Sequence, residues 1–245
     1  MTVLAVIVFV ALQYYNAGYG YLHTRKWGIS VSNKIGWIIM EAPVFFLMWI
    51  MLMHAERSVT VTIWTITFIF EMHYFQRSFI FPLLIRGKST MPVAIIIMGM
   101  VFNSINAYMQ GGWLYHYCPP DMYSDAWLHS PKFIIGTLVF LFGFYTNLQS
   151  DYIIRHLRKD GDPSHKHYIP YGGMFKYVSS ANYFGEITEW VGFALLSWSP
   201  SGLVFALWTI ANLVPRSNSL YNKYNEEFGE EFSKLNRKRV IPFIY

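Results

Sequence analysis

Charged residues are scarce in seven stretches of the chain, each close to the roughly 20 residues that a helix needs to cross a bilayer. The stretches are 3–22, 35–53, 60–84, 92–110, 131–150, 174–197 and 200–215, and the last is short. They predict an all-α, multi-pass membrane protein with seven transmembrane helices. No linker, compositional break or internal repeat divides the chain, so we expect a single domain over residues 1–245.

Polar residues interrupt five of these runs at intervals of three or four, so that they share one side of each helix. They are Trp37 and Glu41; Glu71, Tyr74, Arg77 and Ser78; Asn103, Asn106 and Gln110; Asn147, Asp151, Arg155 and Arg158; and Asn182, Glu186 and Glu189. An ionisable group at the centre of a spanning helix costs roughly 2.5 to 3.5 kcal/mol. The charged residues therefore indicate a shared functional site, whereas any single amide could equally be an interhelical hydrogen bond.

The composition agrees with a membrane protein. Hydrophobic residues make up 54% and charged residues only 13% of the chain, and the mean hydropathy is +0.28. Soluble chains carry about twice that share of charge. The net charge of +5 needs no nucleic acid to explain it, because the basic residues gather where membrane topology places them.

Lys and Arg residues collect in the segments that face inward if the N-terminus lies outside. These segments are 23–34, 85–91, 151–173 and the tail from 216, whereas Arg57 and Lys132 fall in the opposite loops. This asymmetry predicts an outside or lumenal N-terminus and a cytoplasmic C-terminus. The membrane could be the endoplasmic reticulum membrane or the bacterial cytoplasmic membrane. The first run lacks preceding basic residues and a small-residue cleavage pattern, so we expect a retained helix.

The motifs of common soluble sites are missing. No Gly-x-Gly-x-x-Gly follows a strand, and Gly87-Lys88-Ser89 lacks the upstream glycine of a phosphate-binding loop because Pro82 stands there. The histidines form no His-Glu-x-x-His pattern, and the single Cys118 excludes an internal disulfide and a Cys-rich metal site. We therefore predict no metal.

Three stretches carry a more specific pattern: Asn-x-x-Ser-Asp-Tyr-Ile-x-Arg-x-Leu-Arg-Lys at 147–159, Ile-Pro-x-Gly-Gly-x-Phe-x-Tyr-Val at 169–178, and Ala-Asn-Tyr-Phe-Gly-Glu-Ile-x-Glu-Trp at 181–190. Shorter matches accompany them: Trp37 with Glu41 and Pro43, His73-Tyr74 with Arg77, Arg86-Gly87, Asn106-x-Tyr108-x-Gln110, and Ile241-Pro242-Phe243. With these residues the chain closely resembles the steroid 5-alpha-reductase family, over nearly everything after residue 35.

The resemblance implies an NADPH-dependent oxidoreductase that adds hydride to the C4=C5 double bond of a 3-oxo-4-ene steroid, inside seven helices that enclose cofactor and lipid substrate. Glu41 and Tyr74 match the catalytic pair that holds the 3-keto oxygen, and Trp37 joins them in substrate binding. Hydride addition to an enone moves negative charge onto that oxygen, where a phenol donor can contribute about 3 to 4 kcal/mol. Glu41 would orient or recharge the Tyr74 proton, and water could protonate the alpha carbon.

The resemblance also implies a set of NADPH-binding residues. They are Asn147, Asp151, Arg158, Asn182, Glu186, Trp190, Arg216 and Tyr224. Arginine suits the cofactor phosphates because a guanidinium pairs with two oxygens at once. Leu220 departs from the family, which carries a functional histidine there. The inner loop is about two residues longer, which leaves open whether Lys166, His167 or Tyr168 contacts the cofactor.

Two alternatives stay open. The same fold and cofactor could reduce another conjugated lipid, such as a trans-2-enoyl thioester or a polyprenal, although Trp37 and Glu41 match the steroid branch. Carboxylates inside helices also suit a transporter or proton channel, but the chain shows neither the repeats nor the paired broken helices of transporters. The expected partners are a steroid or other lipid, NADPH and membrane lipids, without nucleic acid, and a monomer is plausible.

Overall fold

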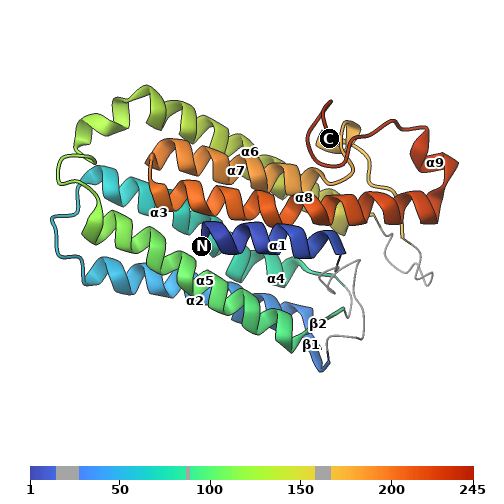
Figure 1. The fold of residues 1–245 in the computed structure, drawn as a ribbon, viewed down its shortest axis with the longest axis horizontal. Coiled ribbons are helices and arrows are strands. Elements are labelled where there is room, and N and C mark those ends of the chain that lie inside the picture. The colour runs from blue at the N-terminus through green and yellow to red at the C-terminus, as the bar shows by residue number, and fades with distance from the viewer. Residues whose placement is uncertain (15–27, 87–88, 158–166) are drawn as a thin grey trace. The chain divides into compact units, whose positions relative to one another are not determined.

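The computed structural model describes residues 1–14, 28–86, 89–157 and 167–245, which are predominantly helical (Figure 1). The chain forms two compact units. Unit 1 comprises Met1–Asn16, Leu138–Gly192 and Ala206–Tyr245, and unit 2 comprises Ala17–Thr137 and Phe193–Phe205. The single domain expected from the sequence stays a prediction, and each unit is described by itself.

Unit 2 is built around the two parallel helices α2 (Asn33–Met53) and α5 (Val93–Gly112), which lie side by side (Figure 1). Each follows a short strand, β1 (Ser30–Ser32) or β2 (Thr90–Pro92), and the two strands pair antiparallel. Glycines allow the close approach, because a Cβ at Gly99 would overlap the Met40 side chain. The polar stripes of α2 and α5 are thereby held next to each other.

A third helical run packs against α2 and runs in the opposite direction (Figure 1). It consists of α3 (Val61–Phe75), the π-helical turn η3 (Gln76–Ile80) and α4 (Phe81–Leu84). The Thr60 hydroxyl caps its start by accepting from the Ile63 amide at 3.2 Å. Pro82 lacks an N–H and its ring would crowd the carbonyl of Ser78 in a regular helix, which accounts for the wider turn before it. Such π turns often occur at functional sites.

The rest of unit 2 lies after α5. The π-helical turn η4 (Trp113–Tyr117) extends α5, and the 3₁₀ turn η5 (Asp125–His129) precedes α6 (Pro131–Arg155). The Tyr123 hydroxyl donates to the Ser197 carbonyl at 2.6 Å, and the Trp127 indole donates to the Leu196 carbonyl at 2.9 Å. These bonds anchor this loop to the last turn of α7 (Ala181–Ser197).

Unit 1 contains α1 (Thr2–Tyr14), most of α6 and α7, the greater part of α8 (Pro200–Phe228), the 3₁₀ turn η6 (Gly173–Lys176) and α9 (Glu230–Ser233). Helices α6 and α7 run antiparallel in direct backbone contact. A Cβ on Gly143 would overlap the Glu189 backbone, and one on Gly185 would lie 2.8 Å from the Gly143 carbonyl oxygen. This pair of glycines sets how closely the two helices pack.

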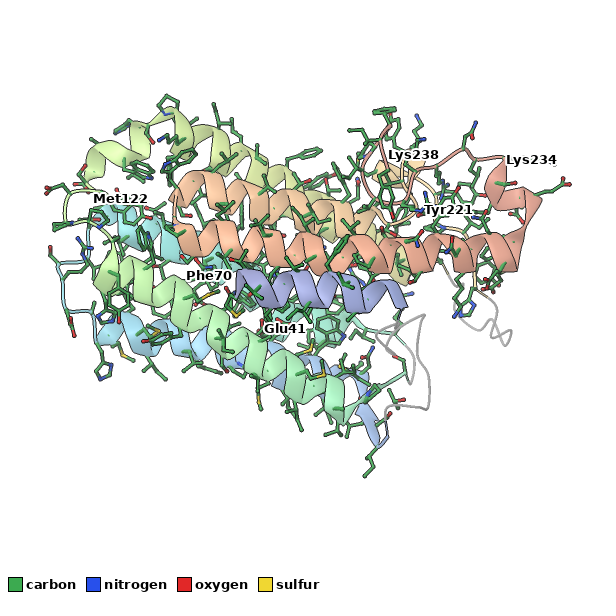
Figure 2. The ribbon with its side chains drawn as sticks, viewed as in Figure 1. Glu41, Phe70, Met122, Tyr221, Lys234 and Lys238 are labelled. Atoms are coloured by element: carbon green, nitrogen blue, oxygen red, sulfur yellow. The ribbon has the colours of Figure 1, made fainter. Side chains whose placement is uncertain are left out.

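The C-terminal segment runs back along residues 177–180. Val178 and Lys238 form a parallel bridge, and the amides of Ser179 and Ser180 donate to the carbonyls of Lys238 and Arg239 at 2.8 and 3.1 Å. Tyr221 and Lys238 belong to this part of unit 1 (Figure 2). A 3₁₀ turn and a segment paired with the C-terminal residues therefore occupy 173–180, where the hydropathy pattern had predicted the start of a transmembrane helix at residue 174.

Among the described residues, three helices are long and apolar enough to cross a membrane, namely Asn33–Met53, Val93–Tyr117 and Pro131–Arg155. Each predicted apolar run coincides with a helix over part or most of its length in the described residues. The sixth run becomes helical only at Ala181, and the seventh continues well beyond residue 215, to Phe228. The count of seven spans stays a prediction.

Candidate active site

Helix α5 holds both residues of the predicted catalytic pair through two asparagines. The Asn103 amide donates to Glu41 Oε2 at 3.0 Å and to the Met40 carbonyl at 2.9 Å. The Asn106 amide donates to the Tyr74 hydroxyl oxygen at 3.0 Å. Residues three apart are neighbours on a helix surface, with Cβ atoms about 5 to 6 Å apart. The Glu41 carboxyl and the Tyr74 phenol are thus bound by adjacent side chains, within unit 2.

The orientation of Asn106 follows from a longer chain of hydrogen bonds. Gln110 donates to Asn106 Oδ1 at 3.2 Å and to the Ser201 carbonyl at 3.0 Å. Because the Asn106 oxygen is engaged by Gln110, its amide nitrogen is the atom that faces Tyr74. The Tyr74 oxygen accepts in this bond, so the phenolic proton is not used by it and can serve as a donor elsewhere.

The Tyr74 ring lies in an aromatic core. Its side chain is 2% exposed, and its centroid lies 4.8 Å from that of Phe70 and 5.0 Å from that of His73. Phe70 in turn packs against Phe193 at 5.4 Å. A phenol in such dry surroundings interacts more strongly with a developing charge than it would in water.

Trp37 lies one turn before Glu41 and forms a stack with Arg77. The Arg77 guanidinium carbon lies 4.6 Å from the Trp37 ring centroid and 4.4 Å from that of Phe81. The two rings meet edge to face at 5.1 Å. Cation–π contact of this kind fixes the planes of all three side chains, so Trp37 presents a defined aromatic surface near the catalytic pair.

The remaining predicted residues lie in unit 1, on α6, α7 and α8. Asn147 and Asp151 are 3% and 6% exposed, and the Asn147 amide donates to the Asn182 carbonyl at 3.0 Å. This bond ties Asn147 of α6 to Asn182, the first residue of the polar stripe on α7 that also contains Glu186. Trp190 is 1% exposed and packs edge to face against Phe140 at 6.3 Å.

Arginines and tyrosines gather on α8 and the C-terminal segment of unit 1. Arg216, 5% exposed, donates to the Tyr183 hydroxyl at 3.3 and 3.4 Å. Arg237 donates to the Pro170 carbonyl at 2.8 Å, and Arg239 donates to Asn218 Oδ1 at 2.7 Å. In the ranges that the structure describes, neither Arg237 nor Arg239 forms an ion pair with an acid. Their positive charge remains available to an anion.

Tyr224 extends this group by two helical turns. It stacks on Phe232 with centroids 5.2 Å apart. Burial raises the pKa of Tyr224 to about 12, and burial likewise lowers the pKa of the nearby Arg237. The tyrosine is therefore a neutral hydrogen-bonding group at physiological pH, and the arginine stays charged.

Two serines beside the predicted cofactor residues lack a partner. The hydroxyls of Ser150 and Ser180 are buried and form no hydrogen bond within the described part of the chain. Ser150 precedes Asp151, and Ser180 lies two residues before Asn182. Buried polar groups are nearly always satisfied in folded proteins, so these two hydroxyls are suited to a ligand.

Some predicted positions are not brought into this group. Arg158 and Lys166 lie outside the described residues. His167 pairs with Glu227 at 2.9 Å on the surface, and Leu220 is a half-buried residue of α8. The structure therefore leaves open which loop residue faces the cofactor.

Sequence reasoning noticed Asn103, Asn106, Gln110 and Arg77 but did not assign them to the site. Their signal was present, because the three amides form the polar stripe of the fourth apolar run. Spacing shows only that they share a helix face, however. It does not show which partner each one binds, and only the partners connect these residues to the predicted site.

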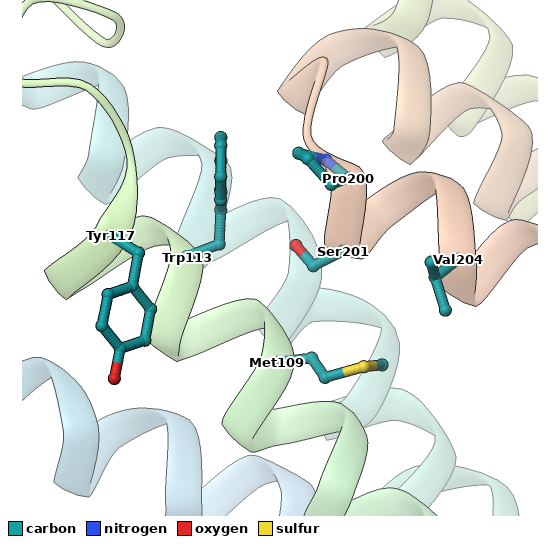
Figure 3. A pocket seen from close by; sticks show the side chains of 6 residues that line it. All are labelled: Met109, Trp113, Tyr117, Pro200, Ser201 and Val204. Atoms are coloured by element: carbon teal, nitrogen blue, oxygen red, sulfur yellow. The ribbon is translucent and has the colours of Figure 1, made fainter. Parts of the chain in front are cut away.

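Unit 2 also contains an open hollow of about 260 Å³ between α5 and the start of α8 (Figure 3). It is lined by Met109, Trp113, Tyr117, Pro200, Ser201 and Val204. None of the predicted site residues lines it. Ser201 links it to the site, because its carbonyl accepts from Gln110. This hollow is therefore not the cavity predicted to enclose cofactor and lipid, and that cavity stays a prediction.

Comparison with known proteins gives a consistent result. The family model described as 3-oxo-5-alpha-steroid 4-dehydrogenase matches residues 89–245. The chain is 35% identical to steroid 5-alpha-reductase DET2 of Gossypium hirsutum, over 99% of this chain and 94% of that protein. It is 36% identical to DET2 of Arabidopsis thaliana (96% and 90%) and to 3-oxo-5-alpha-steroid 4-dehydrogenase 1 of Bos taurus (98% and 93%).

Proposed function

Because this chain belongs to the 3-oxo-5-alpha-steroid 4-dehydrogenase family, we propose that it reduces the C4=C5 double bond of a 3-oxo-4-ene steroid with NADPH. The chain is an oxidoreductase acting on CH–CH bonds, as the names of its relatives indicate, rather than a transporter. The observation that carries the specific proposal is the pair of bonds by which α5 holds Glu41 and Tyr74.

Tyr74 would donate its phenolic proton in a hydrogen bond to the 3-keto oxygen. As hydride reaches C5, the C4=C5 electrons move toward the carbonyl and the oxygen gains negative charge. Asn106 donates to the phenol oxygen at 3.0 Å, which polarises the O–H bond and strengthens Tyr74 as a donor. A preorganised donor at such an oxygen contributes about 3 to 4 kcal/mol.

Glu41 would act with Tyr74 on the same oxygen. Its Oε2 accepts from Asn103, which orients the carboxyl group, and this group would hydrogen-bond the phenol or the keto group. A proton from water would add to C4 and complete the saturated 3-oxosteroid, so that the substrate gains one hydride and one proton. Trp37, held by Arg77, would supply an apolar face for the rings of the substrate.

NADPH would supply the hydride, and the residues of unit 1 have the chemistry to hold it. Arg216, Arg237 and Arg239 suit its phosphates, because guanidinium groups pair strongly with phosphate oxygens. Asn147, Asp151, Asn182 and Glu186 would bind ribose hydroxyls and the carboxamide. The unpartnered hydroxyls of Ser150 and Ser180 would contribute further hydrogen bonds, and Tyr224, Trp190 and Arg158 complete the proposed set.

The protein would sit in the membrane with seven spans, its N-terminus outside or lumenal and its C-terminus cytoplasmic. The three long apolar helices support a membrane location, and the distribution of basic residues supports this orientation. The inner arginines would then face the compartment that contains NADPH. The membrane would be the endoplasmic reticulum or the bacterial cytoplasmic membrane, and the protein could act as a monomer.

Turnover of defined steroids tests the proposal. Detergent-purified protein is incubated with testosterone, progesterone or 4-androstene-3,17-dione and either NADPH or NADH, and products are identified by mass. We expect a gain of two hydrogens that depends on NADPH. Product formation from a trans-2-enoyl thioester or a polyprenal, but from none of the steroids, would move the assignment to another conjugated lipid.

A further inference from the structure

Glu71 is a buried acid to which the proposed mechanism gives no role. It lies on α3, and its side chain is 3% exposed. Neither carboxyl oxygen has a hydrogen-bond partner among the described residues, and no ion pair joins it to a basic side chain there. Buried polar groups without partners are rare and destabilising, so this arrangement indicates a group whose partner is a ligand.

Two buried hydroxyl groups lie near Glu71. Thr67, one turn earlier on α3, shares a hydrogen bond of 2.8 Å with the Tyr115 hydroxyl of η4. Tyr115 is close enough to Glu71 for the two groups to interact electrostatically. Thr67 and Tyr115 are both fully buried. A carboxyl and two hydroxyls therefore meet in an otherwise apolar interior, and the two hydroxyls already satisfy each other.

Glu71 shares a helix face with Tyr74. The residues are three apart, which separates them by about 4.5 Å along the helix axis, and side chains on a helix lean toward its N-terminus. The Glu71 carboxyl therefore lies on the Thr67 side of the Tyr74 phenol. A steroid whose 3-keto oxygen is held by Tyr74, and whose rings run along α3, would pass Glu71 with the rings that adjoin its enone ring, and its D ring would lie beyond Glu71.

Glu71 is poorly suited to donate a proton to the reacting carbon. Giving up its proton would leave a buried carboxylate with no cation beside it, which is very costly in an apolar interior. A neutral carboxylic acid, by contrast, offers one O–H donor and one carbonyl acceptor. That combination matches a hydroxyl, which can both accept and donate, or a ketone, which can accept.

We propose that Glu71 binds an oxygen substituent of the substrate that lies beyond the enone ring, a hydroxyl or a ketone, and so sets the preference for oxygenated steroids. This inference rests on the proposed function and specifies its substrate class. The bond would form at a residue that the reaction itself leaves untouched. Binding should therefore depend on Glu71, whereas the chemical step should not.

The experiment pairs two substrates with two variants. 11-Hydroxyandrost-4-ene-3,17-dione carries a hydroxyl on its C ring, nearer to the 3-keto oxygen than any D-ring oxygen, and androst-4-ene-3,17-dione has the same enone without that hydroxyl. Wild type, Glu71→Leu and Glu71→Gln are compared by kcat and KM at saturating NADPH, and by the shift in Tm that each steroid produces. Thr62→Val is the control, because it also replaces a buried polar side chain of α3 with an apolar one, although Thr62 donates to the Ser124 carbonyl at 2.8 Å.

We expect Glu71→Leu to raise KM for 11-hydroxyandrost-4-ene-3,17-dione about tenfold, the effect of losing one buried hydrogen bond, with little change for androst-4-ene-3,17-dione. Glu71→Gln keeps a donor and an acceptor and should resemble wild type. Equal losses in kcat for both steroids would overturn the inference by placing Glu71 at the enone, and equal KM values throughout would also overturn it. If wild type reduced neither steroid, the proposed function would fail. The Tm shifts would then decide whether Glu71 binds the additional oxygen. An equal shift by both steroids in wild type would then refute the role of Glu71.

Discussion

Tyr74→Phe removes one hydroxyl from the proposed site and leaves the ring in place. The ring is held by Phe70 and His73 at 4.8 and 5.0 Å, so the helix packing should survive. Loss of a single preorganised donor to a developing oxyanion typically lowers kcat by about 10² to 10³. We expect a decrease of that size in the rate of steroid reduction, with NADPH binding unchanged because the proposed cofactor residues lie in unit 1.

The same substitution also leaves the Asn106 amide without its acceptor, which costs about 1 to 3 kcal/mol of stability. Activity must therefore be separated from stability. Tyr123→Phe provides the match, because Tyr123 is also 2% exposed, donates to the Ser197 carbonyl at 2.6 Å and accepts from the Trp113 indole at 2.9 Å. It should lower Tm by a comparable amount and keep its turnover.

The assay measures kcat and KM for testosterone by product mass, NADPH affinity by cofactor fluorescence, and Tm for both variants. Turnover of Tyr74→Phe within about threefold of wild type would refute the role of the phenol as the carbonyl donor. An equal loss of kcat in Tyr123→Phe would show that any missing buried hydroxyl disables the enzyme, and the argument from geometry would fail as well.

Four further substitutions, one of them a control, test other parts of the structure. Asn106→Leu should lower kcat about tenfold, since the phenol loses the bond that orients it, and steady-state kinetics with unchanged NADPH affinity would confirm this. Gly143→Ala should destabilise the protein by about 1 to 3 kcal/mol because its Cβ would overlap the Glu189 backbone. Gly112→Ala, whose Cβ would lie 3.3 Å from Tyr117, should leave Tm nearly unchanged. Arg216→Gln should raise KM for NADPH at least tenfold while KM for the steroid changes little, and an unchanged NADPH KM would remove Arg216 from the cofactor site.

The helices were predictable from hydropathy, but their ends were not. Residues 174–180 are apolar and directly precede α7, yet they form a 3₁₀ turn and pair with the C-terminal segment. Hydropathy measures how well a side chain tolerates an apolar environment, and it carries no information on a backbone partner sixty residues away. The extension of α8 to Phe228 was missed for the opposite reason, because its last turns are polar although they are helical.

The candidate site was likewise predictable only in part. The resemblance and the helical spacing identified Glu41 and Tyr74, and the structure adds the two amides that hold them. Asn103 and Asn106 looked like interchangeable members of one stripe, with structural hydrogen bonding as an equally good explanation. Which amide binds Glu41 and which binds Tyr74 depends on the parallel packing of α2 against α5 and the antiparallel packing of α3, and no periodicity within one helix specifies that arrangement.

Glu41 and Glu71 show most clearly what the sequence could not separate. Both are lone acids in apolar helices, and insertion costs alone treat them as equals. In the structure Glu41 accepts from Asn103, whereas both oxygens of Glu71 lack a partner in the described residues. A carboxyl group that the protein already orients is prepared to act on a reacting oxygen. One that is left unsatisfied gains most from a ligand that completes its hydrogen bonds, and on this ground we assign chemistry to Glu41 and recognition to Glu71.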